Sequence, residues 1–537
     1  MSNTQHFLYF IIFIIGLSLT VAFGVWWFEP SHIANNFHGL FHGIDIFLFL
    51  LLSYVVWYQI TNELFMWVVA HGMKHPQQPM KPQKDLRVAF LTAFVPGTEP
   101  MDMLEKTLKA MIAVDYPHET WLLDEGDDEK VKKLCKKYNV WHYSRKGIAK
   151  YNLKHGPYTM KTKGGNYNSW YDKFGRDYEF VAQIDVDFIP KKNFLMKTLG
   201  YFQDPEVAFV GSPQVYGNTK DSWITKGAAE QAYGFYGSMQ KGFFGSDMQL
   251  FIGANHVVRV AAHNSIGGYA GHIVEDHLTG MKFYSKKWKS VYVPEILAVG
   301  EGPATWDAYF SQQMRWAYGL IHILFTKSPT IFRKMKMKHI VNYFLLQQYY
   351  FYGLAQVIGI VLLSLYFLFG IQSTIMAFLP LLVLYVPLLL WQQVIFIWLQ
   401  KYNIDPKNES GLMLRAKLLN YAAWPIYFLA FAGVILGKRL TYKVTPKGKQ
   451  QKTDTSFWLF LPHFILGSIT IFDLVVGFYL HHDAMQLVFW AVANTCFMYF
   501  FVINVFVEKV YKLLRSIRVI TFFSSKLEFT IPKINFN

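Results

Sequence analysis

The residues with the clearest potential for chemistry are two aspartates that follow a short apolar run. In "YEFVAQIDVDFIP", Asp185 and Asp187 stand two residues apart, directly after "FVAQI". Carboxylates with this Asp-x-Asp spacing can share a hard divalent cation, Mg²⁺ or Mn²⁺, through their oxygens. Such a cation would neutralise a diphosphate and stabilise it as a leaving group. Taken alone, the pattern is more typical of a solvated turn. Its position at the end of an apolar run, and the motifs around it, favour a metal site.

Two further stretches place polar side chains where an anionic ligand could bind. Asp124 ends the apolar run "TWLLD". In "KTKGGNYN", Lys163 offers a point charge for phosphate, and Asn166 offers a hydrogen-bonding amide. The two glycines between them allow a close approach of the backbone. Taken alone, this stretch is more typical of an exposed glycine turn.

Two later stretches could handle an acceptor. In "GHIVEDHLTG", Glu275 and Asp276 precede an expected helix. A carboxylate there either caps the helix, which is the commoner use, or removes a proton from a hydroxyl group. In "SQQMRWAYG", Arg315 could contact phosphate, and the flat face of Trp316 could stack on a sugar ring. An aromatic anchor at a membrane interface is an equal alternative for Trp316.

The sequence around these residues predicts an α/β domain that would hold them. An apolar strand over 88–95 is followed by a helix pattern from Met101 to Ile112, and "TWLLDEG" reads as the next strand. Alternation of strand, helix and strand predicts a mostly parallel sheet. Ligands of such sheets collect at the carboxyl ends of the strands, where Asp124, Asp185 and Asp187 are expected.

Long apolar runs on both sides of this domain predict a membrane protein. The chain has 537 residues, of which 53% are hydrophobic. A span needs about 20 apolar residues to cross about 30 Å of hydrocarbon. We expect about six spans, and the runs without Lys or Arg cover residues 7–28, 44–69, 343–370, 376–399, 456–480 and 485–507.

The distribution of positive charge predicts the orientation. The chain has a net charge of +16, and every Lys and Arg lies in 74–338, 401–452 or 509–533, outside the apolar runs. This positive-inside pattern places those segments in the cytoplasm, facing anionic lipid and substrate rather than nucleic acid. The further apolar segment 412–436 would carry the basic loop "TYKVTPKGK" outside if it crossed, so we expect it to lie in the interface. An ordinary seventh span is the alternative.

These boundaries divide the chain into six parts. The polar domain and the last run each hold a single Cys, which argues against a disulfide framework and agrees with a reducing compartment. The predicted parts are two transmembrane helices (1–73), the polar domain with terminal interface helices (74–338), two transmembrane helices (339–400), an interfacial helix and cytoplasmic loop (401–455), two transmembrane helices (456–508) and a basic cytoplasmic tail (509–537).

In chain order, these residues resemble the motifs of the processive family 2 glycosyltransferases, the cellulose synthase-like group. The family pattern is an Asp after the second strand, Lys-x-Gly-Asn, Asp-x-Asp, Thr-Glu-Asp and Gln-x-x-Arg-Trp. The corresponding stretches are Asp124, "KGGN", "DVD", "VED" and "QQMRW", the last beginning at Gln312. The resemblance implies an α-helical membrane protein with an inserted cytoplasmic catalytic domain of the GT-A-like, Rossmann-type α/β fold.

The resemblance also implies roles for the residues. Asp276, beside Glu275, would be the catalytic base. Asp185 and Asp187 would hold the divalent cation, and Gln312 and Trp316 would bind the acceptor. Donor binding would fall to Asp124, Lys163, Asn166, Asp185 and Arg315.

The stretch "YKVTPKG" resembles the cytoplasmic gating loop of cellulose synthases, Phe-x-Val-Thr-x-Lys-Gly, with Tyr442 in place of Phe. By this likeness Thr445 and Lys447 would contact the nucleotide. Three departures stand out: "VPGTEP" lacks the family's Tyr and Asn but keeps Glu99 as a stand-in for its Glu, Val274 replaces Thr, and "DEG" replaces Asp-Asp-Gly.

Together these features predict an inverting enzyme that polymerises a UDP-sugar, with UDP-glucose preferred, into a β-linked polysaccharide and passes it through the membrane. The expected location is the plasma (inner) membrane, with the catalytic domain and both termini cytoplasmic. Expected partners are the UDP-sugar, the growing chain, the bilayer and accessory export subunits; oligomeric state stays open. The alternatives are a hyaluronan- or chitin-type synthase, a non-processive enzyme acting on a lipid, and a transporter without catalysis.

Overall fold

The computed structural model describes residues 2–438, 440 and 457–516. The chain divides into two compact units. The first comprises Met1–Ile358 and Thr374–Lys452, and the second comprises Gly359–Ser373 and Thr453–Asn537. All the described residues with an expected role in chemistry belong to the first unit.

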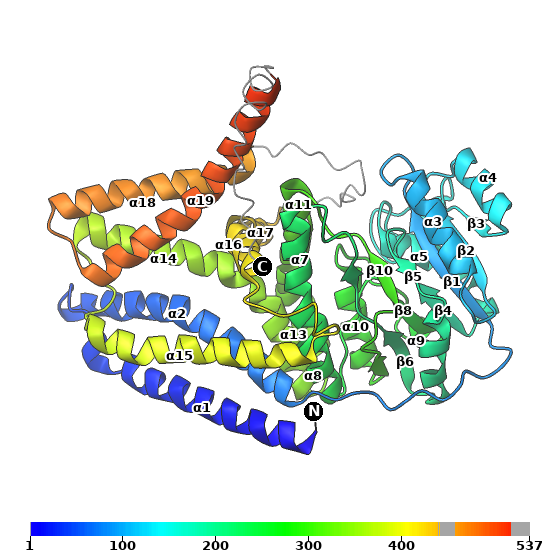
Figure 1. Ribbon diagram of the computed structural model, residues 1–537, viewed down its shortest axis with the longest axis horizontal. Coiled ribbons are helices and arrows are strands. Elements are labelled where there is room, and N and C mark those ends of the chain that lie inside the picture. The colour runs from blue at the N-terminus through cyan, green and yellow to red at the C-terminus, as the bar shows by residue number, and fades with distance from the viewer. Residues whose placement is uncertain (1, 439, 441–456, 517–537) are drawn as a thin grey trace, which may run out of the picture. The chain divides into compact units, whose positions relative to one another are not determined.

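A seven-stranded sheet forms the core of the α/β domain of the first unit (Figure 1). Its spatial order is β3 (Trp141–Tyr143), β2 (Glu119–Asp124), β1 (Val88–Phe94), β4 (Phe180–Gln183), β8 (His256–Arg259), β6 (Val207–Gly211) and β9 (Lys289–Tyr292). All neighbours pair in parallel except β8, which is antiparallel to both β4 and β6. The predicted, mostly parallel α/β domain is therefore present, with one reversed strand inside it.

Burial on both faces explains the unbroken apolar strands. In β1, Phe90 and Leu91 point to opposite faces because side chains alternate along a strand. Phe90 joins a core with Leu104 and Leu108 of α3 (Met101–Ile112), whereas Leu91 joins a second core with Trp170 of α5 (Lys163–Phe174). Further helices of this domain are α4 (Glu129–Tyr138), α6 (Phe194–Thr198), α8 (Gln240–Gly245), α9 (Val260–Ser265) and α10 (Glu275–Ser285).

A second, three-stranded sheet connects distant parts of the chain. Its strands are β5 (Ile189–Pro190), β10 (Ala298–Gly300) and β7 (Val215–Tyr216), in that order. β5 follows the "DVD" stretch directly, and β10 leads into α11 (Trp306–Thr326). This sheet therefore ties the segment after Asp187 to the approach of the "QQMRW" helix.

Two short helices connect the membrane part of the first unit to the catalytic domain. α16 (Leu414–Ala422) packs against α7 (Trp223–Gly234), and α17 (Trp424–Ile435) packs against α11. The pair is bent by 40° at Ala423, which precedes Pro425 at the start of α17. A proline is tolerated in the first turn of a helix but interrupts a continuous one, so the predicted single interfacial helix is two helices.

Six helices or helix pairs in the described residues are long and apolar enough to cross a membrane, or seven if the bent pair counts as one span. The first unit contains Asn3–Trp27 (α1), Gly39–His71 (including α2, His42–His71), the beginning of Met337–Phe369 and Phe378–Tyr402 (including α15, Phe378–Leu399). The second contains Phe457–Tyr479, which includes α18 (Leu461–Tyr479), and Met485–Val507, which lies within α19 (Met485–Ser516). The third span is built from α13 (Met337–Gln348) and α14 (Tyr352–Phe369), and α12 (Ser328–Phe332) precedes it. The six predicted runs correspond to these six segments.

Candidate active site

Three neighbouring parallel strands end at one edge of the sheet and deliver the predicted acidic residues there. Asp124 is the last residue of β2 and is paired in register with Phe94, the last residue of β1. On the other side of β1, β4 ends at Gln183, and Asp185 and Asp187 follow it. Asp187 is 8% exposed, whereas the side chain of Asp185 is 31% exposed. Asp124 therefore lies at the carboxyl end of β2, and Asp185 and Asp187 follow that of β4.

Asp124 is fully buried and organises the loop that follows it. Its two carboxylate oxygens accept hydrogen bonds from the backbone N–H groups of Gly126 (2.8 Å) and Asp128 (2.6 Å). The second oxygen also lies 3.1 Å from Nε2 of His142. Oxygen and nitrogen atoms of Asp124, Asp127 and His142 lie within 4.8 Å of one another, a spacing that could hold a cation. In this group both oxygens of Asp124 are already bound by backbone amides.

Lys163 is the first residue of α5, and its ammonium group is central to the site. Thr162 caps this helix by accepting a hydrogen bond from Gly165 N at 3.1 Å. Lys163 Nζ donates to Asp185 Oδ1 and, at 2.5 Å, to the carbonyl oxygen of Gly253. Burial alone would lower the pKa of Lys163, but the charge of Asp185 beside it leaves that pKa raised. The ammonium therefore stays charged.

The glycines of "KTKGGNYN" lie in the first turn of α5, so the alternative of an exposed glycine turn is wrong. Both are buried, and a Cβ on Gly164 would lie 3.2 Å from the carbonyl oxygen of Ala270. Asn166 is 3% exposed, and its Oδ1 has no hydrogen-bond partner among the described residues. Asn168 instead fastens the helix, because its amide bonds the backbone of Pro157 and Tyr269.

Glu275 and Asp276 form the first turn of α10 and face the same place as Lys163. The N-cap residue Val274 makes no side-chain capping bond, and Asp276 Oδ1 accepts a hydrogen bond of 2.8 Å from the adjacent N–H of His277. A Cβ placed on Gly253 would lie 3.4 Å from Asp276 Oδ2 and 3.6 Å from Lys163 Nζ. Gly253 therefore marks the point on which both charged groups converge.

Burial dominates the protonation of these carboxyls. It raises the pKa of Glu275 to about 7, and the neighbouring charge of Asp276 adds to the increase. Burial also raises the pKa of Asp276, while Lys163 and Arg315 act in the opposite direction. The two carboxyls thus exchange protons closer to neutral pH than ordinary carboxyls do.

On α11, Gln312, Arg315 and Trp316 are three and four residues apart and so share one face of the helix. The charge of Arg315 reaches both carboxyls of α10. Trp316 is partly buried and packs against the core that lies on the α5 side of the sheet. This packing places Trp316 inside the catalytic part of the first unit.

Glu99 closes the loop after β1. It is 7% exposed, and its Oε2 accepts a hydrogen bond of 2.8 Å from Val95 N. The loops after β1 and β2 touch, since a Cβ on Gly126 would lie 2.6 Å from Pro96 Cγ. Thr445 and Lys447 lie outside the described residues, so their predicted contacts stay predictions.

Comparison with known proteins gives the family. Residues 180–391 match the model for glycosyl transferase family group 2. The chain is 25% identical over 289 residues to the UDP-forming cellulose synthase catalytic subunit of Pseudomonas fluorescens (strain SBW25), covering 52% of this chain and 37% of that protein. Against the same subunit of Xanthomonas axonopodis pv. citri (strain 306), identity is 26% over 275 residues, covering 49% and 36%. The chain therefore carries a family 2 glycosyltransferase domain and is similar to cellulose synthase catalytic subunits.

The glycosyltransferase spans a little over a third of the length of these curated relatives. Among solved structures, the mannosyltransferase PcManGT from Pyrobaculum calidifontis, in complex with GDP-Man and Mn²⁺, aligns over 73% of this chain and 100% of its own, with 14% identity and a TM-score of 0.47. The predicted glycosyltransferase class is confirmed, and so is the prediction of a membrane protein with an inserted α/β domain.

Tyr216, at the end of β7, is a residue of the glycosyltransferase site that the motifs did not indicate. Its hydroxyl lies near Gln312, and the charges of Asp187 and Arg315 both act on it. Burial is the main cause that raises the pKa of Tyr216 to about 12, so the phenol stays neutral. Its position depends on the three-stranded sheet, which no local pattern indicates.

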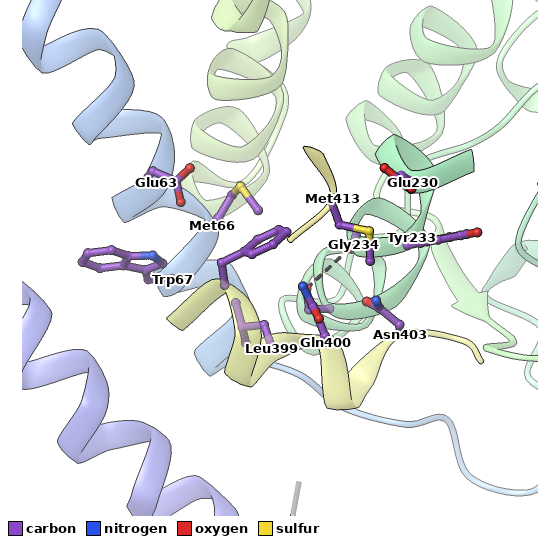
Figure 2. A pocket seen from close by; sticks show the side chains of 12 residues that line it. Glu63, Met66, Trp67, Glu230, Tyr233, Gly234, Leu399, Gln400, Asn403 and Met413 are labelled. Carbon is purple, nitrogen blue, oxygen red and sulfur yellow. Dashed lines mark hydrogen bonds between the residues drawn. The ribbon is translucent and has the colours of Figure 1, made fainter. Parts of the chain in front are cut away.

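A small cavity of the glycosyltransferase, about 40 Å³, lies between α2, α7 and the end of α15 (Figure 2). Glu63 of α2 and Glu230 of α7 both line it. Glu230 is paired with Arg415 of α16, with 2.8 Å between Oε1 and Nη1. The volume suits a few water molecules rather than a sugar.

Proposed function

We propose that this protein is a processive, inverting glycosyltransferase that polymerises a UDP-sugar, with UDP-glucose preferred, into a β-linked polysaccharide and moves the product across the membrane. One observation carries the proposal: Lys163, Asp185 and Asp276 converge around Gly253. A charge for phosphate, a carboxylate for a cation and a candidate base are thereby within reach of one sugar nucleotide. The names of the cellulose synthase relatives, which are UDP-forming, support the choice of donor.

The donor would lie along the carboxyl edge of the sheet. Asp124 and the loop closed by Glu99 would face the uridine, and the start of α5 would face the diphosphate, where helix N-terminal amides favour negative charge. The residues proposed to bind it are Asp124, Glu99, Lys163, Asn166, Asp185, Arg315, Thr445 and Lys447. The buried Oδ1 of Asn166 has no hydrogen-bond partner in the part of the chain that the structure describes, which supports its inclusion.

Asp185 and Asp187 fit a hard divalent cation. Carboxylate oxygens are the ligands that Mg²⁺ and Mn²⁺ prefer, and Asp185 already attracts the ammonium of Lys163. When bound, such a cation would supply positive charge to the diphosphate. The chain's own contribution to the same charge would come from Lys163 and Arg315.

In the proposed step, Asp276 accepts the proton of an acceptor hydroxyl. The acceptor oxygen attacks the anomeric carbon of the donor from the face opposite the diphosphate, and the bond from that carbon to the phosphate oxygen breaks. UDP leaves with the electron pair, and the configuration at the carbon inverts. Lys163 and Arg315 stabilise the negative charge that develops on the leaving group.

Trp316 and Gln312 would hold the acceptor end of the growing chain. An indole face packs well against the CH groups of a sugar ring, and Gln312 lies near the hydroxyl of Tyr216. Retention of the product at this place would allow the next addition without release. The membrane helices would then carry the polymer outwards from a cytoplasmic site at the plasma (inner) membrane.

The experiment uses the full chain, purified in detergent or nanodiscs, with single UDP-sugars and Mg²⁺ or Mn²⁺, followed by linkage analysis of the product. A long β-linked glucan from UDP-glucose is expected. If the enzyme adds a single sugar to a lipid, it is a non-processive lipid glycosyltransferase. If it makes polymer from another UDP-sugar, that sugar is its donor. UDP release without any acceptor-linked product would contradict the proposal.

A further inference from the structure

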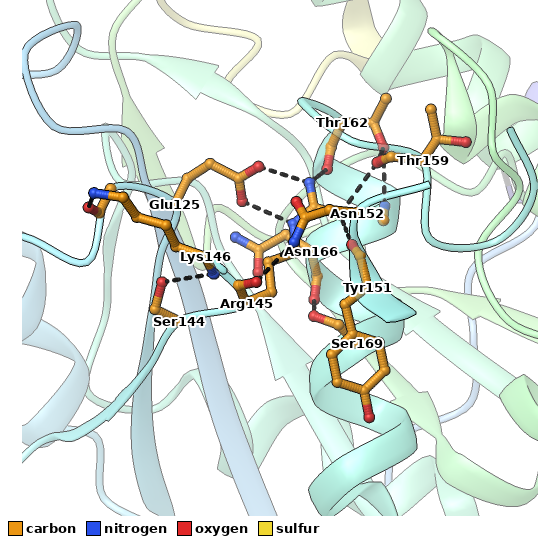
Figure 3. A network of polar contacts seen from close by, with 12 residues as sticks. Glu125, Ser144, Arg145, Lys146, Tyr151, Asn152, Thr159, Thr162, Asn166 and Ser169 are labelled. Atoms are coloured by element: carbon orange, nitrogen blue, oxygen red, sulfur yellow. Dashed lines mark hydrogen bonds and ion pairs between the residues drawn. The ribbon is translucent and has the colours of Figure 1, made fainter. Parts of the chain in front are cut away.

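Arg145 is a buried cation that the proposed chemistry does not use. It lies between β3 and α5, and its side chain is 1% exposed. The guanidinium makes five hydrogen bonds: to both carboxylate oxygens of Glu125 and to the carbonyl oxygens of Tyr151, Thr159 and Thr162 (Figure 3). A buried charge is tolerated only when it is paired and fully hydrogen-bonded, and Arg145 meets that condition.

The first anchor of Arg145 is the residue that follows Asp124. Arg145 Nη2 lies 2.6 Å from Glu125 Oε1, and Nε lies 3.0 Å from Oε2. This two-point contact fixes direction as well as distance, which a single point charge does not. The Glu of "DEG", where the family has a second Asp, therefore has a partner of its own within the fold.

The second anchor is the loop that leads to Lys163. Arg145 Nη1 donates to the carbonyl oxygen of Thr159, and Nη2 donates to that of Thr162, at 3.1 and 3.2 Å. Thr162 is the N-cap of α5. Just before it, Lys161 has a φ of 57°, a left-handed backbone conformation that residues other than glycine seldom adopt. Arg145 thus fastens a loop whose backbone is strained.

Gly165 completes this arrangement. A Cβ at that position would lie 2.3 Å from the carbonyl oxygen of Thr159 and 2.7 Å from Arg145 Nη1. The first turn of α5 can therefore rest on the guanidinium only because residue 165 has no side chain. Asn166 lies beside the same network in Figure 3.

We propose that Arg145 is a positioning residue for the donor, which with Glu125 clamps the loop after Asp124 to the start of α5. The inference rests on the proposed function, because it takes Asp124, Lys163 and Asn166 to bind one sugar nucleotide. Arg145 touches none of the reacting atoms. It holds the two donor-binding segments at a fixed separation, so that both meet the same ligand without prior rearrangement.

The test measures UDP binding and steady-state kinetics with full-length protein in detergent, in the presence of Mn²⁺. The variants are Arg145→Lys, Glu125→Gln and the double variant. Lys150→Gln is the matched control, because Lys150 belongs to the same segment but forms an exposed pair with Asp172. We expect each single variant to raise the Kd for UDP and the KM for the UDP-sugar about tenfold or more, the scale on which supporting residues act. The value of kcat should fall by a smaller factor. The double variant should bind UDP no more weakly than Arg145→Lys does, and the control should have the Kd and KM of the parent.

Folding is checked by thermal unfolding of each variant. Glu125→Gln keeps a neutral hydrogen-bond acceptor, so it tests the clamp if Arg145→Lys does not fold. A folded Arg145→Lys or Glu125→Gln variant that binds UDP like the parent would overturn the inference while leaving the proposed function intact. If the parent itself fails to bind UDP, it is the proposed function that is wrong.

Discussion

The two adjacent carboxyls at the start of α10 lie out of water, and burial decides how they hold protons. A general base has to be ionised when the acceptor hydroxyl arrives. Lys163 and Arg315 favour the ionised forms of both carboxyls, whereas burial opposes them. The balance leaves a base whose proton affinity is higher than that of an ordinary aspartate, which helps it to accept a proton near neutral pH.

Replacing Asp276 by Asn keeps the shape of the side chain and removes its ability to accept a proton. We expect polymer formation to fall about 10²–10⁴-fold, the usual contribution of a general base, while UDP still binds. Product formation and UDP affinity are measured on the same preparation. Asp204→Asn, which alters an exposed carboxylate paired with Lys289, serves as the control and should be unaffected. Full activity of Asp276→Asn would remove this residue from the role of base.

The raised pKa of Glu275, about 7, predicts an acidic limb in the pH profile. As pH falls through about 7 the pair takes up a proton, so kcat/KM should fall there rather than near pH 4. In Glu275→Gln the group that titrates near 7 is gone, and the limb should move to lower pH. A parent profile that stays flat down to pH 5 would contradict this assignment.

Folding stability should respond in the opposite direction. Because the pKa of Glu275 rises from its ordinary 4.5 to about 7 on folding, the stability it contributes is fully present below pH 4.5 and is lost as pH rises through about 7. Thermal unfolding measured beside kcat/KM therefore separates the two causes of a low rate in acid. A loss of activity without a loss of stability identifies the titration.

At the scale of elements, the alternation of strands and helices and the acidic strand ends could be predicted because both are local. In the runs that end in Asp124 and Asp185, both the apolar stretch and the acidic residue that terminates it can be read from the local sequence. The partners of Arg145 could not be predicted, since three of its five bonds go to carbonyl oxygens whose positions depend on the folded loop. The buried glycines of α5 were misjudged for the same reason: the atoms that require them belong to Thr159 and Ala270.

The contact between α7 and α16 joins the catalytic domain to the bent helix pair α16–α17. Glu230 pairs with Arg415 and also accepts a bond of 3.2 Å from Ala416 N, in the first turn of α16, where an anion is favoured. Arg415→Met would leave Glu230, 5% exposed, without its cation. We expect a loss of about 3–5 kcal/mol in the free energy of unfolding, the usual cost of breaking a buried pair.

Thermal and denaturant unfolding in one detergent measures that loss. Lys417→Gln is the matched control, because it removes a positive charge from the same helix at an exposed position. Its effect should stay within the small range of surface substitutions. Equal stability of Arg415→Met and Lys417→Gln would show that the pair does not hold α16 in place.

At the scale of the whole molecule, the topology depends on whether the bent pair α16–α17 crosses the membrane. A contact just after the C-terminal end of α17 favours a pair that does not cross and stays on the same side of the membrane as the catalytic domain. The hydroxyl of Tyr318, on the same helix as Arg315 and Trp316, donates to the carbonyl oxygen of Lys438 at 2.8 Å. A crossing pair would have to deliver Lys438 to the opposite side from α11, and this bond could not form.

Single cysteines placed in a background without Cys135 and Cys496 decide between the two arrangements. Lys438→Cys should react with a membrane-impermeant thiol reagent only from the cytoplasmic side, since its side chain is exposed and its backbone is held by α11. Lys407→Cys supplies the cytoplasmic reference. Leu40→Cys, in a connection without Lys or Arg, supplies the outer one. Labelling of Lys438→Cys together with Leu40→Cys would make α16–α17 a seventh span, and would require every segment after it to change sides.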